Sequence, residues 1–253
     1  MSTSGPLIAQ LTARTIIAPG IADLSFQMRS PEKLAFQAGQ FVSIDVEPEG
    51  TAPGHKPARR SYSIASQSDQ GEALRFIIRV IPSGAASELL MSIPVGGTVR
   101  MTGPHGFFVL DPAHPGDVVF GATGTGIAAV MPMLGELART SGGGPDAAAD
   151  AVPGRRYLYW GLRHQSDLFA HDEIVRLCQR SDTELFIYLS APGQGWAGRQ
   201  GRITGAILQH LPDLRAPTFY LVGNGAMITE LKRELVERGV NRKKQIRTEA
   251  FFD

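Results

Sequence analysis

Cysteine is almost missing from this chain, which has 253 residues and a single cysteine, Cys178. One cysteine excludes a disulfide within the chain, an iron–sulfur cluster held by four cysteines, and a cysteine-rich zinc site. We therefore expect no metal centre. The sequence also has no run of about 18 or more apolar residues, so it predicts no membrane-spanning helix.

The sequence also lacks an excess of either positive or negative charge. The chain has 25 Lys and Arg against 24 Asp and Glu, for a formal net charge of +1. A balance so close to zero gives no support to general binding of nucleic acid or another polyanion. The segment 1–10 has no basic stretch followed by an apolar run of signal-peptide length. We expect a cytoplasmic protein that binds neither membrane nor nucleic acid.

The first half of the chain consists of short β-rich runs separated by proline and glycine. The run 40–46 alternates, and the run 74–81 places Phe76, Ile78 and Val80 on one face. Several closely spaced strands predict a barrel or a sandwich. A short helix is expected at 85–93, where Leu89, Leu90 and Ile93 fit one buried face. The predicted strands are 13–17, 24–28, 40–46, 61–65 and 74–81.

In the second half the spacing of the apolar residues changes, because short apolar strands alternate with helices. This alternation predicts a parallel α/β sheet. The segment 111–116, with two prolines and a glycine, marks the boundary, so we predict a β-barrel domain at 1–113 and an α/β domain at 114–253. The chemistry is expected in the cleft between them. The predicted strands are 118–122, 157–161, 185–189 and 219–222; the helices are 127–139, 172–179, 202–210 and 226–238, with a loop at 141–154.

A glycine-rich turn follows the first strand of the second half. Gly124, Gly126 and Ala129 fit the G-x-G-x-x-(G/A) form, in which small residues let the backbone approach a pyrophosphate at a helix N-terminus. A tight turn that binds nothing is the alternative. No acidic residue ends the next strand, and Arg163 follows it instead. An arginine there suits a phosphate better than a ribose hydroxyl.

Two segments of the first half also have the chemistry of a ligand site. Arg60, Tyr62 and Ser63 supply a guanidinium, an aromatic plane and a hydroxyl, although an ordinary solvated edge strand would contain them too. The segment 84–87 opens the short helix, where main-chain N–H groups and the Ser87 hydroxyl suit an anion. A plain helix cap is the alternative for that segment.

Taken in this order, these segments resemble the ferredoxin–NADP reductase superfamily of FAD-containing enzymes over nearly the whole chain. The resemblance implies a ferredoxin reductase-like fold, with a β-barrel FAD-binding domain and an α/β parallel-sheet NAD(P)-binding domain. It implies that Arg60 binds the FAD pyrophosphate, that Tyr62 packs on the isoalloxazine ring, and that Ser63 bonds near the flavin N5. Further FAD contacts implied by the resemblance are Ser61, Arg79, Val80, Gly84, Ala85, Ala86 and Ser87.

The second half resembles the NAD(P)-binding part of the same family. The resemblance implies that the loop of Thr123, Gly124, Thr125 and Gly126 receives the NAD(P) pyrophosphate. It places Asn224, in a segment similar to the family's Y-x-C-G-x-x-x-M, beside the nicotinamide. The C-terminal end is similar to the family's acidic-x-aromatic closure. Glu249 would then relay a proton or hydrogen bond to Ser63, and Phe251 would cover the flavin and move to admit nicotinamide.

Two positions depart from the family pattern. Val222 stands where the family often has a cysteine beside the nicotinamide, and Ala191 stands where many NADPH-using members have an arginine after the serine. However, the segment 201–204 resembles the second arginine motif of the NADPH-using bacterial branch. The predicted clamp for a 2′-phosphate, which favours NADPH over NADH, consists of Arg163, Arg199 and Arg202. Ser190, the serine before Ala191, is a further predicted cofactor contact.

The resemblance implies a ferredoxin/flavodoxin–NADP(+) reductase, a monomer that transfers electrons between NADPH and a separate one-electron carrier through FAD. An acidic ferredoxin or flavodoxin would meet a basic rim at His55, Lys56, Arg59 and 242–244. Two alternatives stay open. One is an NADH-linked reductase component of a multicomponent oxygenase. The other is a flavin- or nucleotide-binding module without turnover, against which the complete set of Arg60, Tyr62, Ser63 and Glu249 argues.

Overall fold

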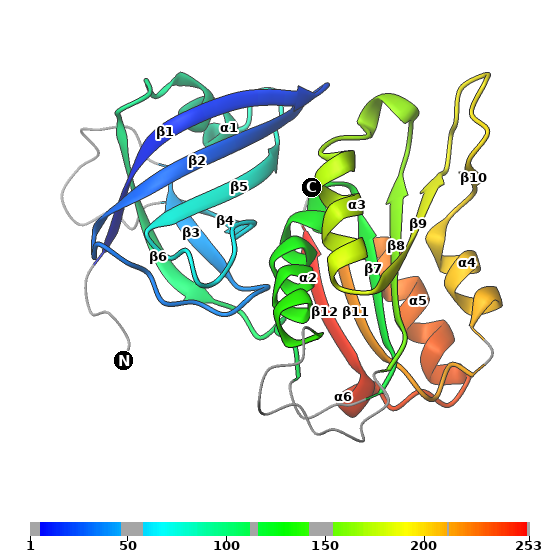
Figure 1. The fold of residues 1–253 in the computed structure, drawn as a ribbon. Coiled ribbons are helices and arrows are strands. Elements are labelled where there is room, and N and C mark those ends of the chain that lie inside the picture. Colours follow the sequence, from blue (N-terminus) through cyan, green and yellow to red (C-terminus); the bar gives the residue numbers. More distant parts are fainter. Residues whose placement is uncertain (1–5, 47–57, 112–115, 142–153, 212, 252–253) are drawn as a thin grey trace.

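A computed structural model of the chain describes residues 6–46, 58–111, 116–141, 154–211 and 213–251. These residues form two six-stranded sheets that lie side by side, one for each half of the chain (Figure 1). The predicted boundary between 113 and 114 and most of the predicted loop 141–154 lie outside the described residues. Within the described residues, no helix is both long and apolar enough to cross a membrane.

The first sheet is antiparallel with the strand order β4-β3-β6-β1-β2-β5. Its edges approach each other after β4, where the Ala65 N–H donates to the Arg75 carbonyl at 2.8 Å, so the sheet curves into a barrel. Alternating side chains fill its core, among them Leu24, Phe26 and Phe76. The elements are β1 Leu7–Ala18, β2 Ile21–Ser30, β3 Phe41–Asp45, β4 Arg59–Ser63, β5 Ala73–Arg79, α1 Ala85–Ser92 and β6 Thr98–His105.

The second sheet is parallel with the order β10-β9-β8-β7-β11-β12. Its buried residues belong to two apolar clusters, one with α2 and α3 and the other with α4 and α5, so helices cover both faces (Figure 1). The elements are β7 Val118–Thr123, α2 Ile127–Ser141, β8 Arg156–Leu162, α3 His171–Arg180, β9 Thr183–Leu189, β10 Arg199–Gln200, α4 Ile203–His210, β11 Thr218–Asn224, α5 Gly225–Glu237, α6 Arg242–Gln245 and β12 Ile246–Phe251.

This strand order fixes where ligands can bind. From β7 the chain continues to β8 on one side, while β11 lies on the other side of β7. Loops from such neighbouring strands leave the sheet in opposite directions, and the crevice between them, at the carboxyl ends of the strands, is the usual ligand site of open α/β sheets. The fold class predicted from the sequence is therefore confirmed, and the sheet places its crevice against the barrel.

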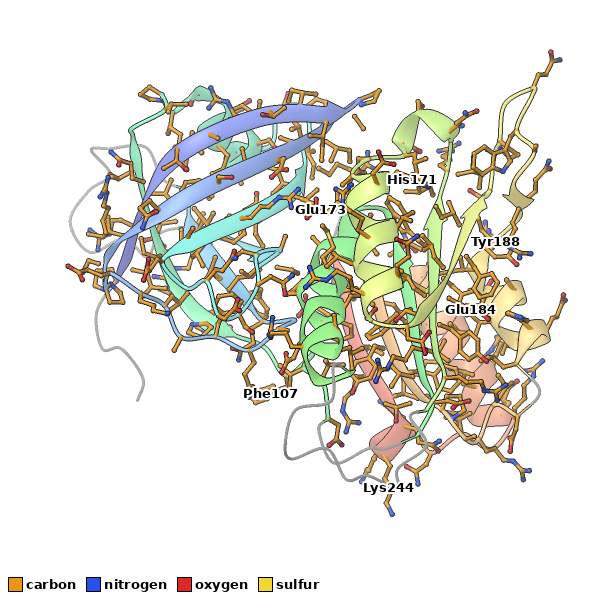
Figure 2. The ribbon with its side chains drawn as sticks, in the orientation of Figure 1. Phe107, His171, Glu173, Glu184, Tyr188 and Lys244 are labelled. Atoms are coloured by element: carbon orange, nitrogen blue, oxygen red, sulfur yellow. The ribbon has the colours of Figure 1, made fainter. Side chains whose placement is uncertain are left out.

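The barrel and the parallel sheet share an apolar interface. Ile21, Ile77 and Phe108 of the barrel half belong to the same buried cluster as α2. An ion-pair network crosses the same interface, because Arg75 on β5 pairs with Asp23 at 2.7 Å and with Glu173 on α3 at 2.6 Å; Glu173 is labelled in Figure 2. These contacts hold the two halves of any site between them in one geometry.

Candidate active site

A cavity of about 1200 Å³ lies between the barrel and the carboxyl ends of the parallel strands. Most small-molecule pockets occupy about 300–1,000 Å³, so this one has room for more than one ordinary ligand. Most of the predicted site residues line it. They are Arg60, Ser61, Tyr62, Ser63, Arg79, Gly84, Ala85, Ala86, Ser87, Thr123, Gly124, Thr125, Arg163, Ser190, Arg202, Asn224, Glu249 and Phe251.

Strand β4 brings a cation, an aromatic ring and a hydroxyl to one wall of the cavity. The Arg60 guanidinium donates to the carbonyl of Arg59 at 2.9 Å, and no carboxylate of the described residues pairs with it. Burial raises the pKa of Tyr62 to about 12, against an opposing effect of the Arg60 charge. An arginine without an acidic partner at a cavity wall fits a ligand phosphate.

Ser63 and Glu249 join the two domains at the cavity. The Ser63 hydroxyl, buried at the end of β4, donates to Glu249 Oε1 on β12 at 2.8 Å. Desolvation raises the pKa of the Glu249 carboxyl to about 7, and the hydrogen bond from Ser63 opposes part of that rise. Near neutral pH, this carboxyl therefore exists in both protonation states, as a group that relays a proton requires.

The raised pKa of Glu249 predicts a pH-dependent stability. Its pKa is 4.5 without burial and about 7 in the folded protein, so between these values the unfolded chain loses a proton that the folded protein keeps. The free energy of unfolding should therefore fall as pH rises through this window. Glu249→Gln should remove the fall, which we expect to be about 1–3 kcal/mol for a partly solvated carboxyl. Denaturant unfolding at pH 5 and pH 8 measures it; equal pH dependence in both proteins would contradict the assignment.

The start of α1 presents main-chain donors to the same cavity. Its N-cap residue, Gly84, makes no side-chain capping bond, which leaves the first N–H groups of the helix available to a ligand. The Ser87 hydroxyl, however, accepts a hydrogen bond from the Ile81 N–H at 2.8 Å. Ser87 therefore holds the turn that begins the helix, and its hydroxyl proton stays available to an anion.

The glycine-rich loop after β7 is fixed from the side of β11. The Asn224 N–H donates to Thr123 Oγ1 at 2.8 Å, and Gly124 has a left-handed φ of +53°. Gly126 does not line the cavity. A Cβ there would lie 2.9 Å from the Val222 carbonyl oxygen, so Gly126 allows the loop to pack on β11.

Residues predicted to bind a phosphate also lie near the start of α4. Arg163, Ser190 and Arg202 line the cavity beside the first residues of this helix, Ile203 and Thr204. Arg202 is the N-cap residue and makes no side-chain capping bond, so the helix N-terminus is available to an anion. A guanidinium pair and a helix N-terminus together suit a phosphate group.

Two further predicted contacts lie outside the cavity lining. The guanidinium carbon of Arg199, on the edge strand β10, lies 4.9 Å from the ring centroid of Phe186 and 6.0 Å from that of Tyr188. Tyr188 is labelled in Figure 2. The charge of Arg199 is thus used in a cation–π stack. Val80 packs against the barrel core. Their direct roles in cofactor binding remain predictions.

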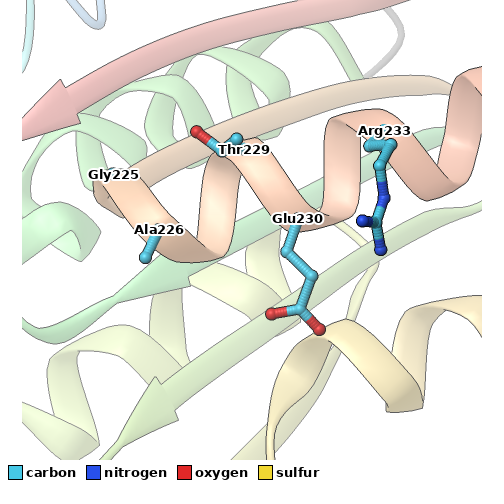
Figure 3. Close-up of a pocket in the computed structure, with 5 residues that line it drawn as sticks. All are labelled: Gly225, Ala226, Thr229, Glu230 and Arg233. Carbon is cyan, nitrogen blue, oxygen red and sulfur yellow. The ribbon is translucent and has the colours of Figure 1, made fainter.

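Sequence reasoning missed several residues that line the cavity. Phe41 pairs in register with Ser63 across β3 and β4, and its ring lies 5.6 Å from that of His105. The sequence predicts these two strands but not how they pair, and the pairing register is needed to place Phe41 beside Ser63. Ile77 and Glu230 also line the cavity and were not predicted, whereas Met227, which lines it too, ends the segment that the resemblance places beside the nicotinamide. A smaller hollow of about 410 Å³ adjoins it on α5 and shares Ala226 and Glu230 with it (Figure 3).

Comparison with known proteins agrees with this geometry. An oxidoreductase FAD-binding domain matches residues 8–110, and an oxidoreductase NAD-binding domain matches residues 120–233. The chain therefore belongs to the ferredoxin–NADP reductase superfamily, as an oxidoreductase that uses FAD and NAD(P)H. The family, the fold class and this cofactor pair, all predicted from the sequence, are confirmed.

Individual relatives are named for different electron-transfer systems. Ferredoxin–NADP reductase B of Sorangium cellulosum is 33% identical over 256 residues, which cover 96% of this chain and 97% of that protein. Methane monooxygenase component C of Methylosinus trichosporium is 34% identical over 70% of this chain, but the match spans only 48% of that protein. A solved cytochrome P450 reductase of Amycolatopsis has a TM-score of 0.80 at 27% identity, covering 99% of this chain and 71% of that one.

Proposed function

We propose that the protein is an NADPH-dependent reductase whose electron acceptor is a separate ferredoxin or flavodoxin. The observation that carries this proposal is the cavity in which Ser63 and Glu249 meet between two sets of phosphate-binding elements, one from each domain. The match to the Sorangium reductase over 97% of that relative's length supports the same choice. The geometry suits two dinucleotides whose reactive ends meet at the Ser63–Glu249 pair.

Different residues of the chain would bind different parts of the FAD. Arg60 and the N-terminal N–H groups of α1 would hold the FAD pyrophosphate, and Tyr62 would pack against the ring. FAD, when bound, accepts a hydride from NAD(P)H and releases electrons one at a time. Ser63 would orient the reacting edge of the ring. Glu249, with its pKa of about 7, would keep a proton within one hydrogen bond of that edge.

Phe251 would control access to the ring. It is half-buried at the end of β12, lines the cavity, and packs against the apolar cluster of the parallel sheet. We propose that it covers the ring in the resting protein and moves when nicotinamide enters.

The choice of NADPH rests on the groups around the start of α4. We expect Arg202→Leu to lower kcat/KM for NADPH about tenfold and to leave NADH within about twofold, because a solvated charge-assisted contact to the 2′-phosphate is lost. Arg180→Leu, at the exposed end of α3 and outside the cavity lining, is the matched control. Steady-state kinetics with both nucleotides measure the effect. An equal loss with NADPH and NADH would contradict a 2′-phosphate role.

A reductase component of an oxygenase is the second candidate. The 34% identity to a methane monooxygenase component favours it. So do Val222, where the family often has a cysteine, and Ala191, where many NADPH-using members have an arginine. Against it, that match spans 48% of the longer protein. This candidate predicts better turnover with NADH and stable association with an oxygenase partner.

Docking of an acidic carrier depends on where the basic residues lie. Arg59 lines the cavity and pairs with Asp45 at 2.8 Å. Lys243 and Lys244 belong to α6, which precedes β12, whereas Glu249 and Phe251 lie toward its carboxyl end; Lys244 extends into solvent (Figure 2). The α6 lysines would therefore act through long-range steering. His55 and Lys56 lie outside the described residues.

Carrier reduction tests the proposed function. The FAD-loaded protein is mixed anaerobically with NADPH or NADH and with an oxidised ferredoxin or flavodoxin, and carrier absorbance is followed. The proposal predicts catalytic reduction of at least one carrier with NADPH as the better donor. Reduction of the bound flavin without turnover of either carrier would argue for the oxygenase partner instead.

A further inference from the structure

Trp160, on β8, connects the core of the parallel sheet to the glycine-rich loop. Its side chain is fully buried, and its ring packs edge-on to Phe169 with centroids 5.2 Å apart. A buried indole N–H needs an acceptor. Here the acceptor is the main-chain carbonyl of Gly124, at 3.0 Å.

This hydrogen bond fixes the direction of the next amide. The Gly124 carbonyl and the Thr125 N–H belong to one planar trans peptide group and point in opposite directions. Because the carbonyl is turned toward Trp160 in the core, the Thr125 N–H points away from the core. Gly124 and Thr125 both line the cavity on that side. The left-handed φ of Gly124, +53°, permits this orientation at little cost.

The loop is thereby held at both ends. On the side of β11, Thr123 Oγ1 accepts from the Asn224 N–H at 2.8 Å. On the side of β8, the indole of Trp160 holds the peptide group one residue further along. A donor fixed in this way needs no reorganisation when an anion arrives.

We propose that Trp160 is a positioning residue for the nicotinamide dinucleotide, because its indole N–H orients the Gly124–Thr125 peptide group so that the Thr125 N–H faces the dinucleotide phosphates. This inference rests on NAD(P)H binding at the glycine-rich loop. It assigns a function to a buried side chain that does not itself line the cavity. The ring itself packs in the core, so only the N–H group has this function.

The test uses Trp160→Phe in the FAD-loaded protein, which keeps an aromatic ring and removes the N–H. The dissociation constant of NADP⁺, read from the change in flavin absorbance, should rise about fivefold, as for one lost hydrogen bond, with FAD affinity unchanged. Trp196→Phe is the matched control, because the Trp196 indole donates to the Arg199 carbonyl outside the cavity lining. Unchanged NADP⁺ affinity in Trp160→Phe, or an equal loss of FAD and NADP⁺ affinity, would overturn the inference.

A second measurement tests the role of Trp160 if the Trp160→Phe variant does not fold. Trp160 and Trp196 are the two tryptophans, so Trp196→Phe leaves one indole N–H resonance in the ¹H–¹⁵N spectrum. That resonance should shift and exchange more slowly when NADP⁺ saturates the protein. A resonance that does not move at saturation would contradict the inference. Wild-type protein that binds no nicotinamide dinucleotide would instead refute the proposed function, so the two failures are distinguishable.

Discussion

Replacing Ser63 by alanine should lower the rate at which NADPH reduces the bound flavin about 10²-fold, the usual effect of removing a positioned donor or proton-transfer group. The Ser63 hydroxyl is buried, lines the cavity and donates to Glu249 at 2.8 Å, so its loss leaves the carboxyl without that donor. The measurement is stopped-flow absorbance of the FAD-loaded protein under anaerobic conditions.

The pH profile separates this role from simple loss of packing. The hydrogen bond from Ser63 lowers the pKa of Glu249, so Ser63→Ala should move the pKa seen in the pH profile above about 7. Thr248→Val is the matched control, because Thr248 precedes Glu249 on β12, is exposed, and does not line the cavity. A Ser63→Ala protein with the wild-type rate and an unchanged pH profile would exclude the Ser63–Glu249 pair from the reaction.

Replacing Arg60 by methionine should weaken FAD binding by about 10²-fold, because two charge-assisted hydrogen bonds of about 1.5 kcal/mol each are lost. Arg60 has no carboxylate partner among the described residues, so the change breaks no ion pair within them. Methionine keeps the length and apolar stem of the side chain. Fluorescence recovery of FAD released on dilution gives the dissociation constant.

Arg100→Met controls for removal of a positive charge from the barrel. Arg100 is on β6, its side chain is 67% exposed, and its one ion pair with a described residue is a 4.0 Å contact with Asp45. We expect this variant to bind FAD as the wild type does. If the two variants lose FAD equally, the effect comes from the net charge, and Arg60 is not a pyrophosphate ligand.

Motifs confined to one segment could be predicted well from the sequence. The segments 60–63, 84–87 and 123–126 each contain their own chemistry, and the structure brings residues of all three to one cavity. The alternation of short strands in one half and of strands and helices in the other predicted both sheets. The local pattern was enough to predict these elements, because the spacing of apolar side chains and the turn residues can be read from residues that are close together in the sequence.

Contacts between distant segments could not be predicted in the same way. Ser63 and Glu249 are 186 residues apart, and only the family resemblance, not the local pattern, implied that they meet. They meet because β12, a short strand that the local pattern did not predict, adds to the sheet beside β11. Strand β6 was missed because Gly103 and Pro104 interrupt its alternation. Arg199 is predicted at a phosphate, which stays a prediction, and its contacts with the rings of Phe186 and Tyr188 on another strand could not be predicted from its own segment. Which distant side chains a residue contacts depends on tertiary packing.

The most direct test of the account is an anaerobic titration of the purified protein with NADPH and, in parallel, with NADH, followed by visible absorbance. The account predicts a flavin band that NADPH bleaches at much lower concentration than NADH does. A band bleached better by NADH would contradict the 2′-phosphate role of Arg202 and favour an oxygenase reductase. The absence of a flavin band even after FAD is added would contradict the central claim, that the cavity between the two domains is an FAD site.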